Sequence, residues 1–166
     1  ILKIIDAQRV SAKKNGWGFV DFNEPMRKIS LEEQKRDSTF TFCRVDRIHP
    51  DNDGQMVMAY LFLKAQGLAG YEVSEFSIDA QHLDVIVHKN CKISKLKRGK
   101  KNLTFDYLAY ALPYPLDSIP RHGWGNMKSQ RDAMQLVPFM KEFNQERFQV
   151  HNLEKGIYQL TIDDQY

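Results

Sequence analysis

The sequence predicts an α/β fold followed by an appended, mainly antiparallel β extension. A helical opening segment that ends at Gly16 precedes an apolar run at residues 18–22, and a helix before a buried strand is typical of an α/β layer. After Gly70 the chain changes to extended segments separated by turns, which favours antiparallel strands. We therefore expect two domains, an α/β core at residues 1–69 and a β-rich extension with one helix at residues 70–166.

The first helix is predicted from its spacing and from the way it ends. Apolar residues recur near helical spacing at residues 1–10, and Lys13 and Lys14 form a basic last turn before Gly16. Residues 31–36 are polar and helix-forming. A short extended segment at residues 40–43 then leads into a loop at residues 44–53 that is rich in turn-forming residues.

A second helix with a wide apolar face is predicted at residues 54–66. Its apolar residues follow the i, i+3, i+4, i+7 rule at Met56, Ala59, Tyr60 and Leu63. Val57 and Leu61 widen the face, and Gly67 supplies the stop. We expect this helix to be mostly buried.

The extension is predicted to contain extended segments at residues 71–78, 83–88 and 103–110, the last two separated by a basic turn. Pro113 and Pro115 lack the backbone donors of a central strand, so the segment around them should lie at an edge or cross over. Residues 128–144 are predicted as a helix kinked at Pro138. A final pair of strands is predicted at residues 148–150 and 157–162.

Composition places the chain among ordinary globular proteins. Its 166 residues are 42% hydrophobic and 27% charged, which excludes extensive disorder. No stretch approaches the roughly 18 apolar residues of a membrane-spanning helix, so no membrane span is expected. Cys43 and Cys91 are too few for a disulfide framework, and we expect two free, partly buried thiols.

The net charge of +3 does not by itself imply a polyanionic partner, but the basic residues are clustered. Around Gly99 the chain carries Lys89, Lys92, Lys95, Lys97, Arg98, Lys100 and Lys101. Such a cluster can be a phosphate-binding footprint or a solvated hairpin tip. Because no aromatic residues interleave with these charges, we favour the hairpin tip and expect no nucleic-acid partner.

An Asp-x-x-His pair is the candidate for chemistry. Asp46 and His49 lie in the loop that leads into the second helix. A carboxylate bound to one imidazole nitrogen fixes the tautomer and lets the other nitrogen act as a general base. Pro50 restricts His49 to extended backbone conformations, which helps to aim its ring away from the helix. The alternative is that Asp46 caps a turn and His49 is an ordinary surface residue.

The surrounding sequence resembles a known family. Residues 46–67, DRIHPDNDGQMVMAYLFLKAQG, are similar to the last conserved block of SGNH (GDSL-type) hydrolases, in which a catalytic Asp and His precede the final helix. Residues 18–26 resemble the last core strand and following loop of bacterial members. Residues 105–115 and 156–163 look like the C-terminal extension of one bacterial subgroup.

This resemblance implies the C-terminal part of a flavodoxin-like α/β sandwich that cleaves acyl esters through a Ser-His-Asp triad without a metal or other cofactor. Asp46 would orient His49, and His49 would be the general base and then the general acid. The substrate would be an acyl ester, possibly linked to a carbohydrate, and the location secreted or periplasmic. The residues that bind the substrate are not indicated.

The chain departs from the family in lacking the rest of the triad. The family's Gly-Asp-Ser nucleophile block and its Gly-x-Asn-Asp block, which complete the oxyanion hole, are not found here. A base without a nucleophile should not catalyse acyl transfer, so we expect this chain alone to be inactive. The chain opens at Ile1 rather than Met, which suggests an excised or processed piece whose partner is the N-terminal portion carrying the serine.

Other chemistry is less well supported by the sequence. His82, His88, His122 and His151 lack metal-ligand spacing, so no metal is expected. Phosphate-cradling glycine motifs are absent. Trp17 and Trp124 each lie between glycines, where a tryptophan either packs a loop onto the core or offers a binding platform. With the basic cluster, this supports the alternative of a noncatalytic carbohydrate- or polymer-binding module.

Overall fold

The computed structural model describes residues 1–121 and 127–163 and divides into two compact units. Unit 1 comprises Ile1–Tyr71 and Tyr114–Asn144, and unit 2 comprises Glu72–Pro113 and Gln145–Tyr166. The expected boundary after residue 69 is near the first crossing between the units. Residues 114–144 nevertheless pack with unit 1, whereas the sequence placed them in the extension. Each unit is therefore built from two separate stretches of chain.

Unit 1 opens with the predicted helix, α1 (Leu2–Asn15), which ends at Gly16 in the left-handed conformation. The strand predicted at residues 18–22 is wrong, because no described strand pairs with this segment and it forms no helix or strand. A strand needs a hydrogen-bonded neighbour, which apolar composition alone does not supply. Instead, the Arg9 guanidinium lies 5.5 Å from the Phe19 ring and 2.8 Å from the Asp21 carboxylate.

The next helix, α2 (Asn23–Glu33), begins earlier than the helix predicted at residues 31–36. The Asp21 carboxylate accepts hydrogen bonds from the backbone N–H groups of Asn23 and Glu24, which satisfies donors of the first turn. Pro25 is tolerated there because the first turn has no partner for its missing N–H. Residues 23–26 are therefore helical rather than the loop suggested by the resemblance.

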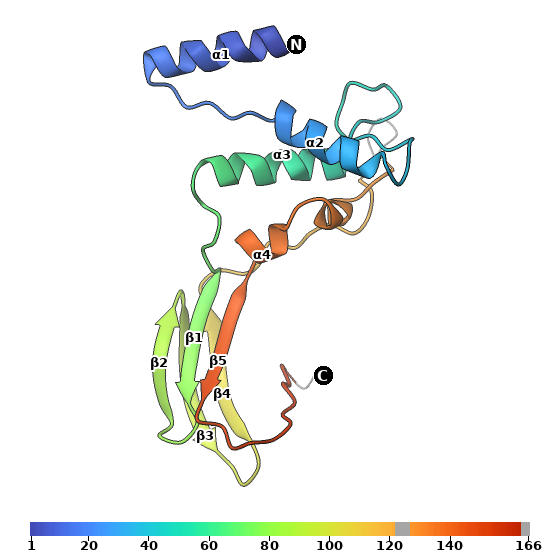
Figure 1. The fold of residues 1–166 in the computed structure, drawn as a ribbon. Coiled ribbons are helices and arrows are strands. Elements are labelled where there is room, and N and C mark those ends of the chain that lie inside the picture. Colours follow the sequence, from blue (N-terminus) through green and yellow to red (C-terminus); the bar gives the residue numbers. More distant parts are fainter. Residues whose placement is uncertain (122–126, 164–166) are drawn as a thin grey trace. The chain divides into compact units, whose positions relative to one another are not determined.

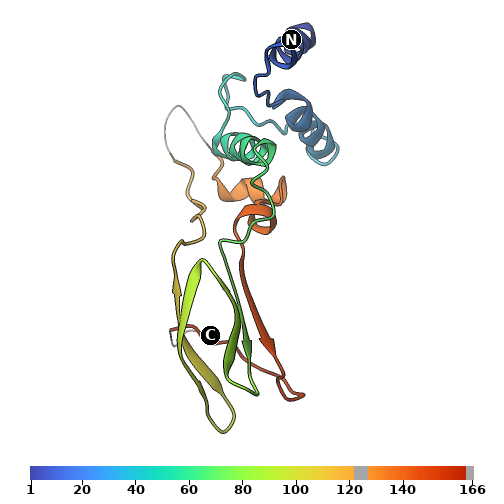
Figure 2. The ribbon, with the colours of Figure 1, turned by 90° about the vertical axis from the view of Figure 1, so that its left-hand side faces the viewer.

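The helix predicted at residues 54–66 is confirmed as α3 (Asn52–Ala65), capped at its N-terminus by Asp51. It is buried on one face only and not mostly buried as expected, since Ala59 and Phe62 are exposed. The helix predicted at residues 128–144 is interrupted at Pro138, which separates the 3-10 helix η1 (Arg131–Gln135) from α4 (Phe139–Phe143). Figures 1 and 2 show α3 beside the segment that carries η1 and α4. The buried core of unit 1 lies between them and is formed by Phe42, Met56, Val57, Tyr60, Ala133, Val137 and Phe139.

Unit 2 contains two small sheets (Figure 1). In the first, β1 (Ser74–Asp79) pairs antiparallel with β2 (Asp84–Lys89) and parallel with β5 (Glu146–His151). In the second, β3 (Cys91–Arg98) pairs antiparallel with β4 (Leu103–Ala109). Phe76 of β1 stacks on Phe148 of β5 at 4.7 Å and on Tyr107 of β4 at 5.0 Å between ring centroids. An aromatic cluster therefore joins the two sheets.

Two predictions in unit 2 are corrected. Most of the predicted basic turn is strand β3, in which Ile93 and Leu96 pack on the core while Lys92 and Lys97 are exposed. The final strand predicted at residues 157–162 is also wrong, because residues 157–161 lie outside any strand and the side chains of Tyr158 and Leu160 are exposed. Alternating apolar and polar residues predict a strand only where the apolar face packs against other residues.

The cysteines are free thiols as expected, with Cys43 half-buried and Cys91 buried. Over the described ranges, 1–121 and 127–163, no helix is both long and apolar enough to cross a membrane.

Candidate active site

The loop that carries Asp46 and His49 is closed at its base by backbone contacts. We call residues 44–50 the dyad loop. Across its base, the Arg44 N–H donates to the His49 carbonyl at 3.0 Å, and the Asp51 N–H donates to the Phe42 carbonyl at 2.7 Å. Cys43 and Pro50 form an isolated antiparallel bridge between these two contacts. The loop therefore leaves and returns to a fixed base immediately before α3.

Asp46 and His49 are brought together within this loop. The Asp46 Oδ2 atom lies 2.8 Å from His49 Nδ1, and its Oδ1 atom accepts the backbone N–H groups of Ile48 and His49, both at 3.0 Å. Arg47 adopts a left-handed backbone conformation with φ of 60°, which allows the tight turn between them. The carboxylate thus holds both the turn and one nitrogen of the imidazole ring.

The electrostatics of the pair suit a fixed anion beside an accessible imidazole. Hydrogen bonds from the Ile48 backbone and from His49 hold the pKa of the Asp46 carboxyl well below its usual range. The Asp46 side chain is 34% exposed and the His49 side chain 56% exposed. An ionised carboxylate at Nδ1 favours the tautomer in which Nε2 exchanges protons with a substrate or nucleophile.

A second Asp-x-x-His turn in unit 2 has the same hydrogen-bonding pattern. Asp79 Oδ2 lies 3.0 Å from His82 Nδ1, and Asp79 Oδ1 accepts the N–H groups of Gln81 and His82. Asn152 also donates to the Asp79 carboxylate at 2.8 Å. These contacts lower the pKa of Asp79 and raise that of His82. This turn was not predicted from the sequence, although the spacing of Asp79 and His82 matches that of Asp46 and His49.

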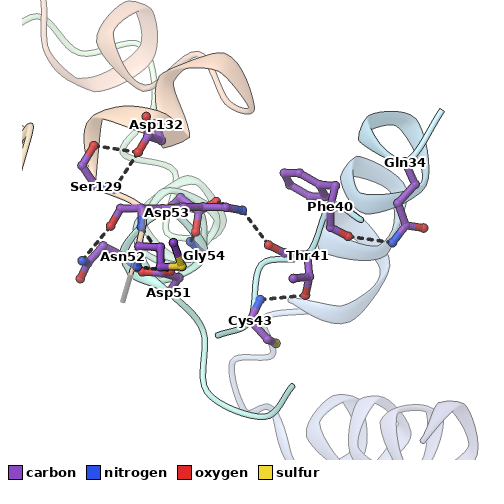
Figure 3. Close-up of polar contacts among 12 residues, drawn as sticks. Gln34, Phe40, Thr41, Cys43, Asp51, Asn52, Asp53, Gly54, Ser129 and Asp132 are labelled. Carbon is purple, nitrogen blue, oxygen red and sulfur yellow. Dashed lines mark hydrogen bonds and ion pairs between the residues drawn. The ribbon is translucent and has the colours of Figure 1, made fainter. Parts of the chain in front are cut away.

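The base of the dyad loop also contacts a distant segment of unit 1. Lys128 Nζ lies 2.9 Å from the Asp53 carboxylate and donates to the Thr41 carbonyl at 2.7 Å. Figure 3 shows Thr41 and Asp53 on the two flanks of the loop. Asp53 is 1% exposed, and its burial raises the pKa of its carboxyl against the opposing effect of the Lys128 ammonium. The pairing of Asp53 with Lys128 could not be predicted from the sequence, because the two residues are distant along the chain and form no motif.

No complete triad is present among the described residues. Asp46 and His49 form a hydrogen-bonded pair. The hydroxyl groups of Ser74 and Ser129, two of the buried serines, bind Tyr107 and Asp132. Within the described part of the chain, no group of three or more His, Cys, Asp or Glu side chains is placed to hold a metal ion. An Asp-His pair of this geometry is chemically able to accept and return a proton.

The features that suggested a binding module are only partly described. Trp17 is 67% exposed, so the interpretation that it packs a loop onto the core is wrong. Trp124 and His122 lie outside the described residues. Several charges of the basic cluster are paired within the protein, including Lys89 with Glu75, Lys95 with Asp106 and Arg98 with Glu154.

Comparison with known proteins finds a similarity to an enzyme. No family model and no curated protein matches the sequence. Among solved structures, the chain is similar to a gut microbial diltiazem-metabolizing enzyme, with 53% sequence identity and a TM-score of 0.81 over 89% of this chain. The match spans 34% of the length of that enzyme. The chain is therefore similar, over nearly all of its length, to one part of a larger enzyme.

Proposed function

We propose that this chain is the C-terminal portion of an SGNH-type serine ester hydrolase and supplies the base of its Ser-His-Asp triad. The observation that carries this proposal is the 2.8 Å contact between Asp46 and His49 on a closed loop that leads into α3. In the proposed enzyme, the α/β part of the chain completes a flavodoxin-like core. The serine and the oxyanion hole belong to the N-terminal portion.

The similarity to a diltiazem-metabolizing enzyme supports an enzymatic role and is compatible with ester chemistry. Diltiazem carries an acetyl ester, so deacetylation is one way in which an enzyme can metabolise it. A Ser-His-Asp triad cleaves such esters without a cofactor. The same similarity to an enzyme favours this proposal over a noncatalytic binding module.

In the proposed mechanism, His49 Nε2 takes the proton of the serine hydroxyl as the serine oxygen attacks the acyl carbon. Nε2 then returns this proton to the leaving alcohol, and the same sequence with water releases the acid. Asp46 stays ionised throughout and stabilises the imidazolium, because its pKa is held well below its usual range. The exposure of the His49 ring lets the N-terminal portion reach it.

A chimera tests this proposal directly. The part of the diltiazem-metabolizing enzyme that the match spans would be replaced by this chain, and turnover of diltiazem and of p-nitrophenyl acetate measured. We expect the chimera to be active and His49→Ala to lower kcat/KM by at least about 1,000-fold. The isolated chain should be inactive.

The matched control is His82→Ala, which removes the equivalent histidine of the second Asp-x-x-His turn. We expect this variant to keep the activity of the chimera. Undiminished turnover in His49→Ala would remove His49 from the mechanism. Equal losses in both variants would indicate general destabilisation rather than catalysis.

A further inference from the structure

We propose that Lys128 is a positioning residue, which fixes the dyad loop and so holds the imidazole of His49 in its working place. This inference rests on the proposed ester hydrolase function. Lys128 lies far from the dyad in sequence and binds the residues on either side of the loop. The observation behind it is that Lys128 binds the chain on both sides of the loop.

The side chain of Lys128 joins the two flanks of the dyad loop. Its ammonium group donates to the Thr41 carbonyl before the loop and to the Asp53 carboxylate after it. It also lies 4.4 Å from the centroid of the Phe40 ring, so an aromatic face covers the charge. One cation thus holds together the chain that enters the loop and the first turn of α3.

The backbone around Lys128 makes a second set of contacts with the same flank. The N–H groups of Met127 and Lys128 donate to the Asp51 carboxylate at 3.0 and 3.3 Å, and the Asn52 side chain donates to the Lys128 carbonyl at 2.9 Å. Asp51 is the cap of α3, and it is 3% exposed. Residue 128 is therefore anchored to the three residues that immediately follow Pro50.

The Lys128 contacts bear on the dyad because they fix the base of the loop that carries it. Asp46 and His49 are bonded to each other and to the loop backbone, so a movement of the loop base would carry the pair with it. A displacement of about 1 Å in a reacting group can cost on the order of 100-fold in rate. The ion pair at the base of the loop is suited to preventing this displacement, because loss of the Lys128 ammonium would leave the buried Asp53 carboxylate without its counter-ion.

The test uses the chimera described above. Lys128→Met should lower kcat by about 10- to 100-fold with little change in KM, because the substrate pocket is retained while the base is misplaced. Lys128→Arg keeps a cation that can reach the same two oxygens and should restore most of the rate. If Lys128→Met fails to fold, the double variant Asp53→Asn/Lys128→Met avoids the unpaired charge and is expected to show the same loss of kcat.

A second lysine of unit 1 provides the matched control. Lys64 lies at the other end of α3 and binds Glu142 at 2.8 Å, so Lys64→Met also removes an ion pair between α3 and the 114–144 segment, far from the dyad loop. Its kcat should be unchanged. Wild-type kcat in the folded Lys128→Met and double variants, with His49→Ala inactive, would overturn the positioning role alone. Full activity in His49→Ala would overturn the proposed function itself.

Discussion

At the scale of single residues, the two Asp-x-x-His turns show that this spacing builds its own geometry. In both turns the aspartate binds two backbone N–H groups with one oxygen and the histidine Nδ1 with the other. The pairing of Asp46 with His49 could therefore be predicted from the sequence, since it is local. The pattern alone does not distinguish a catalytic pair from a turn. The distinction comes from the surrounding sequence and from the proposed nucleophile.

Asp46→Asn tests the carboxylate in a way that the histidine variant does not. The amide keeps the size of the side chain but loses the charge that stabilises the imidazolium and fixes the tautomer, so kcat of the chimera should fall by roughly 1,000-fold. Asp79→Asn makes the same change in the second turn and should leave kcat unaffected. A small loss for Asp46→Asn, in a chimera that needs His49, would show that another group orients the ring.

The acid side of the pH profile should also report on this carboxylate. The Asp46 pKa is held well below its usual range, so the aspartate is ionised at every pH at which the enzyme is assayed. We therefore expect log kcat/KM to fall on the acid side with a slope of one, from a single ionisation. A second ionisation in this limb that disappears in Asp46→Asn would contradict an always-ionised Asp46.

The ion pair between the buried Asp53 and the half-buried Lys128 gives a pH-dependent prediction for stability. Lys128→Met should lower the free energy of unfolding by about 3 kcal/mol at pH 7, because Asp53 is then buried without its counter-ion. Burial raises the Asp53 pKa above its unfolded value, and without Lys128 it should rise further.

The raised pKa of Asp53 determines how the destabilisation by Lys128→Met depends on pH. Relative to the wild type, the penalty is fully present above the Asp53 pKa of the folded variant and fades as pH falls through it. It vanishes below the lower Asp53 pKa of the folded wild type, where the carboxyl is protonated in both proteins. Urea unfolding of the isolated chain at several pH values would measure it, with Lys64→Met as the control. A destabilisation that stays constant down to pH 4 would exclude Asp53 as its source.

At the scale of elements, local patterns predicted what local interactions build. Helix α3 was predicted because its apolar stripe and the glycine that follows it are both features of one continuous stretch of sequence. The strand predicted at residues 18–22 was wrong because a strand needs a hydrogen-bonded neighbouring strand. Strand β3 was taken for a basic turn because its lysines conceal the alternation, which a bulge near Lys95 also disturbs.

The close contact between α3 and the entry to the dyad loop gives a prediction at this scale. A Cβ atom on Gly54 would lie 2.8 Å from the Phe42 carbonyl oxygen and 3.1 Å from the Pro50 Cβ atom. Because the nearest atom belongs to the backbone, Gly54→Ala should destabilise unit 1 by about 1–3 kcal/mol, despite the better helix propensity of alanine.

Gly18→Ala is the control for this prediction, since a Cβ atom on Gly18 meets nothing within 4 Å. Thermal unfolding of both variants measures the difference. A Gly54→Ala variant as stable as the unchanged chain would mean that α3 and the loop base can separate easily. The base of the dyad loop would then not be rigid, which would weaken the positioning role proposed for Lys128.

At the scale of the whole molecule, the division into units was only partly predictable. The change of character near Gly70 was visible in the sequence, but the return of residues 114–144 to unit 1 depends on contacts such as Tyr60 with Glu142, which are distant along the chain. Lys128 belongs to this returning segment. The base of the candidate site therefore could not be predicted from the residues around Asp46 and His49.

Helix α1 supplies the last prediction, because its surface suggests that a larger assembly covers it. Ala12 is buried, but Leu2, Ile4 and Val10 are each more than half exposed. A helix of 14 residues with so little burial is marginal in water, so its amides should exchange rapidly with solvent in the isolated chain. In the proposed enzyme, the N-terminal portion would cover this apolar face and stabilise the helix.

Hydrogen exchange can measure this difference. We expect the amides of α1 to exchange at least about 10-fold more slowly in the chimera than in the isolated chain, since docking buries apolar side chains of the helix. The amides of β2 in unit 2 serve as the internal control and should exchange at the same rate in both proteins. If the α1 amides exchanged at the same rate in an active chimera and in the isolated chain, the nucleophile-bearing portion would not cover α1. The two portions would then have to meet at another surface of unit 1.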